Sequence, residues 1–257
     1  MKTLVVIPAR IGALRLPRKP LRLLSGLPLI VRVWQRISQM NLADAVVVAT
    51  DDDSVASTVR DAGADVVMTS AGHSSGTERV AEVAESPRFR AYETIVNVQG
   101  DEPFIGPGAV RGAAELVSTG RFPLGTAASR AGPEILDTPS LVKVVVADDG
   151  RALYFSRAPI PYLRDPEDAR AQAARTLQHI GVYAYSKDAL QKWVALPVHP
   201  LEEVERLEQL RPLAAGFPMG VAITSEAPAS GIDTEDDLQR ANARWDAFMS
   251  GMVKNAS

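Results

Sequence analysis

The stretch Thr94-Ile95-Val96-Asn97-Val98-Gln99-Gly100-Asp101-Glu102-Pro103 is an apolar run that ends abruptly in two carboxylates. Its β-branched residues favour a strand, and Gly100 and Pro103 predict where that strand ends. In an open α/β sheet, ligands collect beyond the carboxyl ends of the strands. An aspartate at such an end, Asp101, is suited to holding Mg²⁺, which prefers oxygen ligands. The alternative is a turn aspartate that caps the next element.

A second apolar run, residues 3–8, leads into a strongly basic loop. Arg10, Arg15, Arg18 and Lys19 place four cations within ten residues. Arginine forms bidentate contacts with phosphate oxygens, and lysine acts as a mobile point charge. We therefore predict a polyphosphate site, although the spacing fits neither a Walker A loop nor a dinucleotide-binding fingerprint. A solvated surface loop is the alternative interpretation.

Strand-like and helix-like segments alternate through the first half of the chain. We predict strands over 3–8, 45–50, 65–68 and 94–98, and helices over 29–37, 54–62 and 77–85. Such alternation is typical of a parallel sheet covered by helices on both faces.

The second half of the chain is less regular. Its β-rich runs 141–147 and 151–156 flank a predicted turn, and 236–248 is predicted to be a closing helix. The Ala-rich stretch 167–175 follows several prolines, and we expect it to be mobile.

The composition is that of an ordinary globular protein. The 257 residues fit one large domain, with 46% hydrophobic and 23% charged residues. A net charge of −3 gives no nucleic-acid footprint, and the absence of cysteine excludes disulfides and a Cys nucleophile. No apolar run approaches the ~18 residues of a membrane span, and no signal peptide is evident. We expect a cytoplasmic protein whose partners include neither nucleic acid nor membrane.

Nine motifs follow one another in one register across nearly the whole chain. They are IPAR (7–10), RLPRKPL (15–21), VATDDDSVA (48–56), SGTER (75–79), NVQGDEP (97–103), VKVVVADDGRALYFSRAPIP (142–161), HIGVYAY (179–185), LEEVERLEQLR (201–211) and GIDTEDDL (231–238). Together they resemble the nucleotide-sugar cytidylyltransferases, above all those that act on 3-deoxy-D-manno-octulosonate (Kdo).

The resemblance implies a fold and an assembly. The fold is a three-layer α/β/α, Rossmann-like nucleotide-diphospho-sugar transferase fold with a mostly parallel sheet. One domain would span 1–257, with a nucleotide-binding half over about 1–130 and a sugar-binding and dimerisation half over about 131–248. A small excursion from the second half would contribute to a homodimer.

The resemblance also implies a reaction, in which CTP and Kdo give CMP-Kdo and pyrophosphate for lipopolysaccharide biosynthesis, with Mg²⁺ as cofactor. Positioning and charge stabilisation would carry such a reaction without a protein nucleophile. Several alternatives remain open: 8-amino-Kdo or another acidic sugar such as sialic acid as the substrate, a non-catalytic nucleotide-sugar binding homologue, or a glycosyltransferase.

Site residues are carried over motif by motif. The resemblance makes Lys19, Asp101 and Asp233 catalytic, and the two aspartates the ligands of Mg²⁺. It assigns the nucleotide to Arg10, Arg15, Lys19 and Gln99. It assigns the sugar to Arg79, Gln99, Arg157, His179, Tyr183, Glu208 and Gln209.

The residues themselves leave simpler roles open. Asp233 precedes Thr234, a plausible helix N-cap, and could be part of that cap. Arg79 beside Glu78 would ordinarily form a surface ion pair that contributes little to folding stability. A histidine at a position such as that of His179 more often has a structural role than a contact with a ligand.

The basic loop departs from the family pattern at three positions. Ala13 and Leu14 replace small hydroxyl residues, and Arg18 replaces a common glycine. We expect an active enzyme because Arg10 and Lys19 are retained, together with Arg15.

Overall fold

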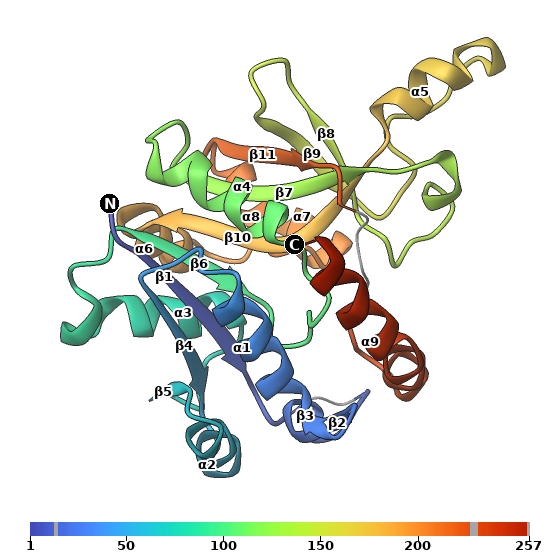
Figure 1. Ribbon diagram of the computed structural model, residues 1–257. Coiled ribbons are helices and arrows are strands. Elements are labelled where there is room, and N and C mark those ends of the chain that lie inside the picture. Colours follow the sequence, from blue (N-terminus) through green and yellow to red (C-terminus); the bar gives the residue numbers. More distant parts are fainter. Residues whose placement is uncertain (13–14, 227–230, 256–257) are drawn as a thin grey trace.

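The structure is a computed structural model that describes residues 1–12, 15–226 and 231–255. Within these residues a nine-stranded sheet forms the centre of the molecule (Figure 1). Its main path runs in the order β11 (Met219–Thr224), β7 (Leu124–Arg130), β10 (Leu177–Ser186), β6 (Thr94–Val98), β1 (Thr3–Ala9), β4 (Ala45–Thr50) and β5 (Asp65–Met68). Along this path only β10 runs antiparallel to its neighbours, so the central sheet is mainly parallel as predicted.

Helices cover both faces of this sheet. One face carries α1 (Leu29–Gln39), α2 (Asp53–Asp61), α4 (Pro107–Ser118) and α9 (Glu235–Asn255). The other carries α3 (Gly76–Glu85), α6 (Lys187–Ala195) and α8 (Leu210–Ala214). The two faces explain the continuous apolar sequence of β1, because Val5 and Ile7 pack into one core while Leu4 and Val6 pack into the other.

The excursion of the second half extends the sheet at one side. The hairpin of β8 (Lys143–Val146) and β9 (Ala152–Ser156) joins β10 through β8. The Ala-rich stretch forms α5 (Ala169–Arg175), an exposed helix that projects from the body (Figure 1), and its mobility stays a prediction. Its end is tied by Thr176, whose hydroxyl donates to the Gln172 carbonyl at 2.9 Å, while the Gln172 amide donates to the Pro161 carbonyl at 2.8 Å.

Two other segments differ in detail from the sequence pattern. The amphipathic sequence 200–210 does not form one helix. The helix α7 (Pro200–Glu205) ends at Arg206, which adopts a left-handed conformation (φ 55°), and α8 begins at Leu210. The last helix, α9, begins one residue earlier than predicted and continues to Asn255. A short hairpin of β2 (Leu23–Leu24) and β3 (Leu27–Pro28) precedes α1.

None of the helices in the described residues combines the length and apolar character that crossing a bilayer requires.

Candidate active site

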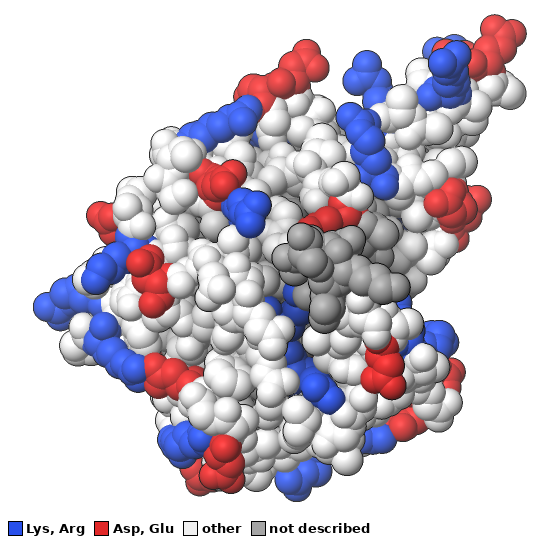
Figure 2. Space-filling view, viewed as in Figure 1, with Lys and Arg blue, Asp and Glu red and all other residues white. Residues whose placement is uncertain are grey.

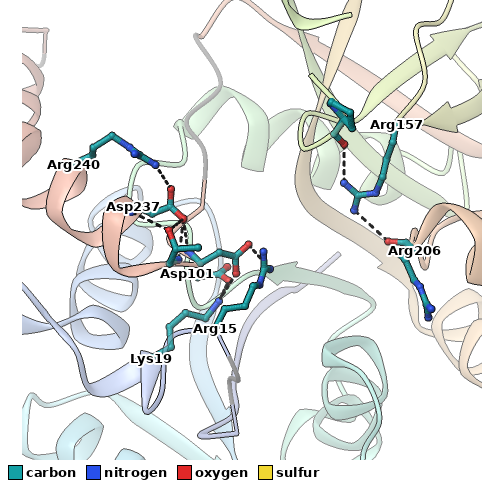
Figure 3. A network of polar contacts seen from close by, with 10 residues as sticks. Arg15, Lys19, Asp101, Arg157, Arg206, Asp237 and Arg240 are labelled. Atoms are coloured by element: carbon teal, nitrogen blue, oxygen red, sulfur yellow. Dashed lines mark hydrogen bonds and ion pairs between the residues drawn. The ribbon is translucent and has the colours of Figure 1, made fainter. Parts of the chain in front are cut away.

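Three segments that are far apart in sequence meet beside the carboxyl ends of β1 and β6. These strands are adjacent and parallel, so the loops after them open at the same edge of the sheet. Lys19 follows β1, Asp101 follows β6, and Asp233 lies two residues before the start of α9. The Lys19 ammonium contacts the Asp101 carboxylate and lies 2.9 Å from Asp233 Oδ1 (Figure 3).

This cluster holds its charges in a partly buried setting. The Lys19 side chain is 17% exposed. Burial opposes its charge, but the neighbouring Asp101 and Asp233 carboxylates outweigh that effect and raise the pKa of Lys19. Arg15 adds a second cation, with Nη2 3.0 Å from Asp233 Oδ2. A further carboxyl, Glu102, has its pKa raised well above the usual value by burial and by the nearby aspartates.

A cavity of about 660 Å³ opens over this cluster, a size suited to a small-molecule substrate. All the residues assigned to the nucleotide or the metal line it, namely Arg10, Arg15, Lys19, Gln99, Asp101 and Asp233. The basic loop and the strand-end aspartate therefore lie at one cavity, and the roles assigned to their residues stay predictions.

The N-terminus of α3 forms another wall of the cavity. Ser74, Ser75 and Gly76 line it, and the Ser75 hydroxyl caps the helix by accepting from the Glu78 amide at 3.2 Å. A helix N-terminus favours anions, so this wall complements the basic loop. Ser74 and Ser75 were not among the predicted site residues, although Ser75-x-x-Glu78 carries the capping-box pattern that marks a helix start.

Gly100 allows the strand ends to approach each other. A Cβ atom added there would lie 2.7 Å from the Pro8 carbonyl oxygen, closer than such atoms pack. A side chain at this position would therefore force β1 and β6 apart where their loops carry Lys19 and Asp101.

Arg79 lines the same cavity, but its guanidinium is held from behind. Its side chain is 3% exposed, with Nη2 3.0 Å from Asp51 Oδ2 and Nη1 in contact with the Thr69 hydroxyl. The simple interpretation of a weak surface pair with Glu78 is wrong, because the observed partner is Asp51 in a buried ion pair. Removing one member of such a pair is costly.

Three residues assigned to the sugar do not line the cavity, namely Tyr183, Glu208 and Gln209. The Tyr183 hydroxyl donates to Gln209 Oε1 at 3.1 Å. Glu208 accepts from the Thr77 hydroxyl at 3.1 Å, and burial raises the pKa of Glu208. Because Thr77 belongs to α3, it connects Glu208 to the helix that walls the cavity.

The His179 side chain contacts other side chains of the protein interior. Its Nε2 lies 2.9 Å from the Thr126 hydroxyl, and its ring packs edge-on against Phe155. Burial lowers the pKa of His179 to about 3, so the imidazole is neutral at neutral pH.

Arg157 lies apart from the Lys19 cluster (Figure 3). Its Nε donates to the Glu205 carbonyl at 2.8 Å and its Nη1 to the Pro139 carbonyl at 3.0 Å. It lines a second cavity, of about 370 Å³, together with Leu136, Asp137, Pro139, Ala158 and Pro159. The structure does not bring Arg157 to the first cavity, and its assignment to the sugar carboxylate stays a prediction.

Of the three positions at which the basic loop departs from the family pattern, the structure describes one, Arg18. Ala13 and Leu14 lie outside the described residues. Arg18 is exposed, with Nη2 3.4 Å from the Ser54 hydroxyl and φ at 54°. That left-handed backbone is one that glycine adopts without strain, which gives a physical reason for the glycine common at this position.

Asp101 and Asp233 suit a divalent cation as well as an ammonium group. Two carboxylates from different segments converge on one positive charge, that of Lys19. Among the described residues, no group of three or more His, Cys, Asp or Glu side chains is placed to hold a metal ion. Mg²⁺ is commonly held by one or two carboxylates with substrate phosphates and water, so the pair fits that pattern.

Comparison with known proteins agrees with this geometry. A cytidylyltransferase family model matches residues 4–223. A 3-deoxy-manno-octulosonate cytidylyltransferase of Gemmatimonas aurantiaca is 58% identical over 96% of this chain and 96% of its own. One of the same name from Polynucleobacter asymbioticus is 44% identical over 92% and 93%. The solved structure of a CMP:2-keto-3-deoxy-manno-octonic acid synthetase complexed with CTP superposes with a TM-score of 0.88 and 38% identity, covering 96% of this chain and 99% of that one.

Proposed function

Because the chain belongs to the cytidylyltransferase family, we propose that it transfers CMP from CTP to Kdo and releases pyrophosphate. The observation that carries this proposal is the convergence of Lys19, Asp101 and Asp233 in one cavity that Arg10 and Arg15 also line. Cations and paired carboxylates at one strand-end edge are what a reaction between two anionic substrates requires.

The chemistry needs no covalent bond to the protein. The anomeric hydroxyl oxygen of the sugar bonds to the α-phosphorus of CTP, the bond from that phosphorus to the β-phosphate oxygen breaks, and the hydroxyl proton passes to solvent. Arg10, Arg15 and Lys19 would bind the triphosphate and offset its charge. The N-terminus of α3, which also lines the cavity, would favour the same anion.

We propose that Asp101 and Asp233 hold Mg²⁺ when substrate is present. When bound, the ion supplies positive charge at the reacting phosphate oxygens. The Lys19 ammonium, which both carboxylates contact in this structure, would remain available to the phosphates.

The sugar is the less defined substrate. Gln99 and Arg79 line the cavity, and Tyr183, Glu208 and Gln209 lie behind the wall that α3 forms. These residues, with His179 and Arg157, are proposed to select an acidic sugar. The substrates that compete with Kdo in this proposal are its 8-amino analogue and sialic acid.

The deciding experiment is pyrophosphate release from CTP and Kdo, with and without Mg²⁺. Reactions with UTP in place of CTP, and with 8-amino-Kdo or sialic acid in place of Kdo, are the controls. We expect release only when CTP, Kdo and Mg²⁺ are present together. Release with another sugar acid alone would change the substrate, whereas CTP binding without any release from folded protein would favour a non-catalytic homologue.

We further propose a cytoplasmic homodimer whose product supplies lipopolysaccharide biosynthesis. The supply of CTP in the cytoplasm supports the location. An exposed aromatic side chain on the excursion, Tyr162 at 81% exposure, supports the dimer.

A further inference from the structure

A line of hydrogen bonds runs from Gln99 at the cavity to β10. Gln99 Nε2 donates to Asn97 Oδ1 at 3.4 Å, and Asn97 Nδ2 donates to the Tyr185 hydroxyl at 3.3 Å. Asn97 and Tyr185 are 0% exposed, whereas Gln99 lines the cavity. A buried asparagine is unusual in a strand, and a polar group buried this fully requires partners. Asn97 has them on both sides.

The contact with Tyr185 gives this line a direction. The amino group of Asn97 donates and the Tyr185 oxygen accepts, so the carbonyl oxygen of Asn97 points the other way, toward Gln99.

This direction fixes the amide of Gln99. Asn97 uses its amino group on Tyr185, so only its carbonyl oxygen faces Gln99. Gln99 must present Nε2 to that oxygen, and its own Oε1 is left for the cavity. A carbonyl oxygen accepts hydrogen bonds from hydroxyl groups but forms none with phosphate oxygens, which are themselves acceptors.

The position of Gln99 selects which hydroxyl it meets. It stands two residues before Asp101, beside the proposed reacting centre, where the hydroxyl-bearing sugar must approach the nucleotide. We propose that Asn97 is a positioning residue that fixes Gln99 as the hydrogen-bond acceptor for a hydroxyl of the sugar acid. The inference rests on the proposed function and adds to it a residue that does not itself line the cavity.

The test compares Michaelis constants for the two substrates. Asn97→Leu has a similar volume and no hydrogen-bonding group, and we expect it to raise the KM for Kdo about tenfold, the size expected for one lost hydrogen bond. The KM for CTP should stay within about twofold. Tyr185→Phe should raise the KM for Kdo by a smaller factor, because Asn97 then keeps its contact with Gln99 but loses its anchor.

A matched control is available on the same strand. Thr94 is also 0% exposed, and its hydroxyl has no hydrogen-bond partner among the described residues. Thr94→Val should leave both Michaelis constants unchanged. The melting temperature of each variant shows whether it is folded.

A double-mutant cycle with Gln99→Ala decides whether Asn97 acts through Gln99. We expect Asn97→Leu to have little further effect on the KM for Kdo once Gln99 is removed. An undiminished effect in that background, or an equal rise in the KM for CTP, would overturn the inference. If the unaltered enzyme turns over a different sugar acid, the cycle is measured on that sugar. Absence of pyrophosphate release from the unaltered protein would instead refute the proposed function and, with it, the inference.

Discussion

At the scale of single residues, the site depends on charges that balance one another. Lys19 would be an unfavourable cation in a partly buried position without Asp101 and Asp233, and the two carboxylates would repel each other without it. Gln99 and Arg79, by contrast, are held by neutral or charged partners behind the cavity wall. Gln99 and Arg79 are thus oriented by residues that do not line the cavity.

Asp101→Asn should reduce turnover by at least about 100-fold while leaving the fold intact, because the amide cannot supply the charge that Mg²⁺ requires. Pyrophosphate release measures the loss, and circular dichroism the fold. Asp149→Asn, in the exposed turn before β9, should have no effect on turnover. Full activity of Asp101→Asn with Mg²⁺ would remove Asp101 from the metal site.

His179 should make folding stability depend on pH. Its pKa is about 3 in the folded protein and 6.5 in the unfolded chain, so below pH 6.5 the unfolded state binds a proton that the folded state does not. This stability is present above pH 6.5 and is lost progressively as the pH falls toward 3, by about 2 kcal/mol at pH 5. Urea unfolding at pH 7 and pH 5 measures it.

The neutral variant His179→Gln lacks this titrating group. Between pH 7 and pH 5 its free energy of unfolding should therefore fall by about 2 kcal/mol less than that of the unaltered protein. Other titrating groups act equally in both proteins and cancel in the comparison. The same pH dependence of stability in the variant and the unaltered protein would show that the pKa of His179 does not differ between the folded and unfolded states.

At the scale of elements, helix ends place the functional groups. The start of α9 is capped reciprocally: the Thr234 hydroxyl accepts from the Asp237 amide at 3.2 Å, and Asp237 Oδ2 accepts from the Thr234 amide at 2.9 Å. The same Asp237 oxygen accepts from the Asp233 amide at 3.2 Å. The alternative role of Asp233 as part of a cap is therefore compatible with its proposed role, since the cap fixes its backbone and leaves its carboxylate to Lys19.

Thr234→Ala should lower the free energy of unfolding by about 1 kcal/mol, because the Asp237 amide loses its side-chain acceptor. Thr234→Ser keeps the hydroxyl and should be close to the unaltered protein. Urea denaturation measures both variants. Equal stability of the alanine and serine variants would show that the hydroxyl does not cap α9.

At the scale of the whole molecule, charge is distributed rather than concentrated. Basic and acidic side chains are interspersed over the face shown in Figure 2, without an extended patch of one sign. The excursion that carries α5 stands away from this body, and Tyr162 on it is 81% exposed. A large aromatic surface of that kind is typical of protein interfaces.

Light scattering should give the mass of two chains. Tyr162→Ser should weaken the dimer and raise the concentration at which it dissociates, because the aromatic ring no longer buries apolar surface. Val204→Ser removes an equally exposed apolar side chain from α7, outside the excursion, and serves as the control. A monomeric unaltered protein would refute the dimer.

The sequence predicted the first half of the fold closely because its strands and helices have clean periodicities. It predicted the second half less well. The turn at Arg206 has no glycine to mark it, and α5 has no buried residue, so no apolar face reveals it. Among the site residues, the cations of the basic loop and Asp101 could be placed because they lie in the segments that follow β1 and β6. Asn97 could not be recognised, because it lies within an apolar run and its partner Tyr185 comes from another strand.

The amino-acid sequence by itself determined the alternating α/β plan, the basic loop, the strand-end aspartate and, through its ordered motifs, the resemblance to cytidylyltransferases. Only the tertiary structure decided which charges meet. It joined Asp233 to Lys19 across more than two hundred residues, paired Arg79 with Asp51, and kept Arg157 away from the first cavity. Local patterns record the conformation of neighbouring residues, whereas ion pairs and hydrogen bonds between distant segments depend on how the strands are ordered in the sheet.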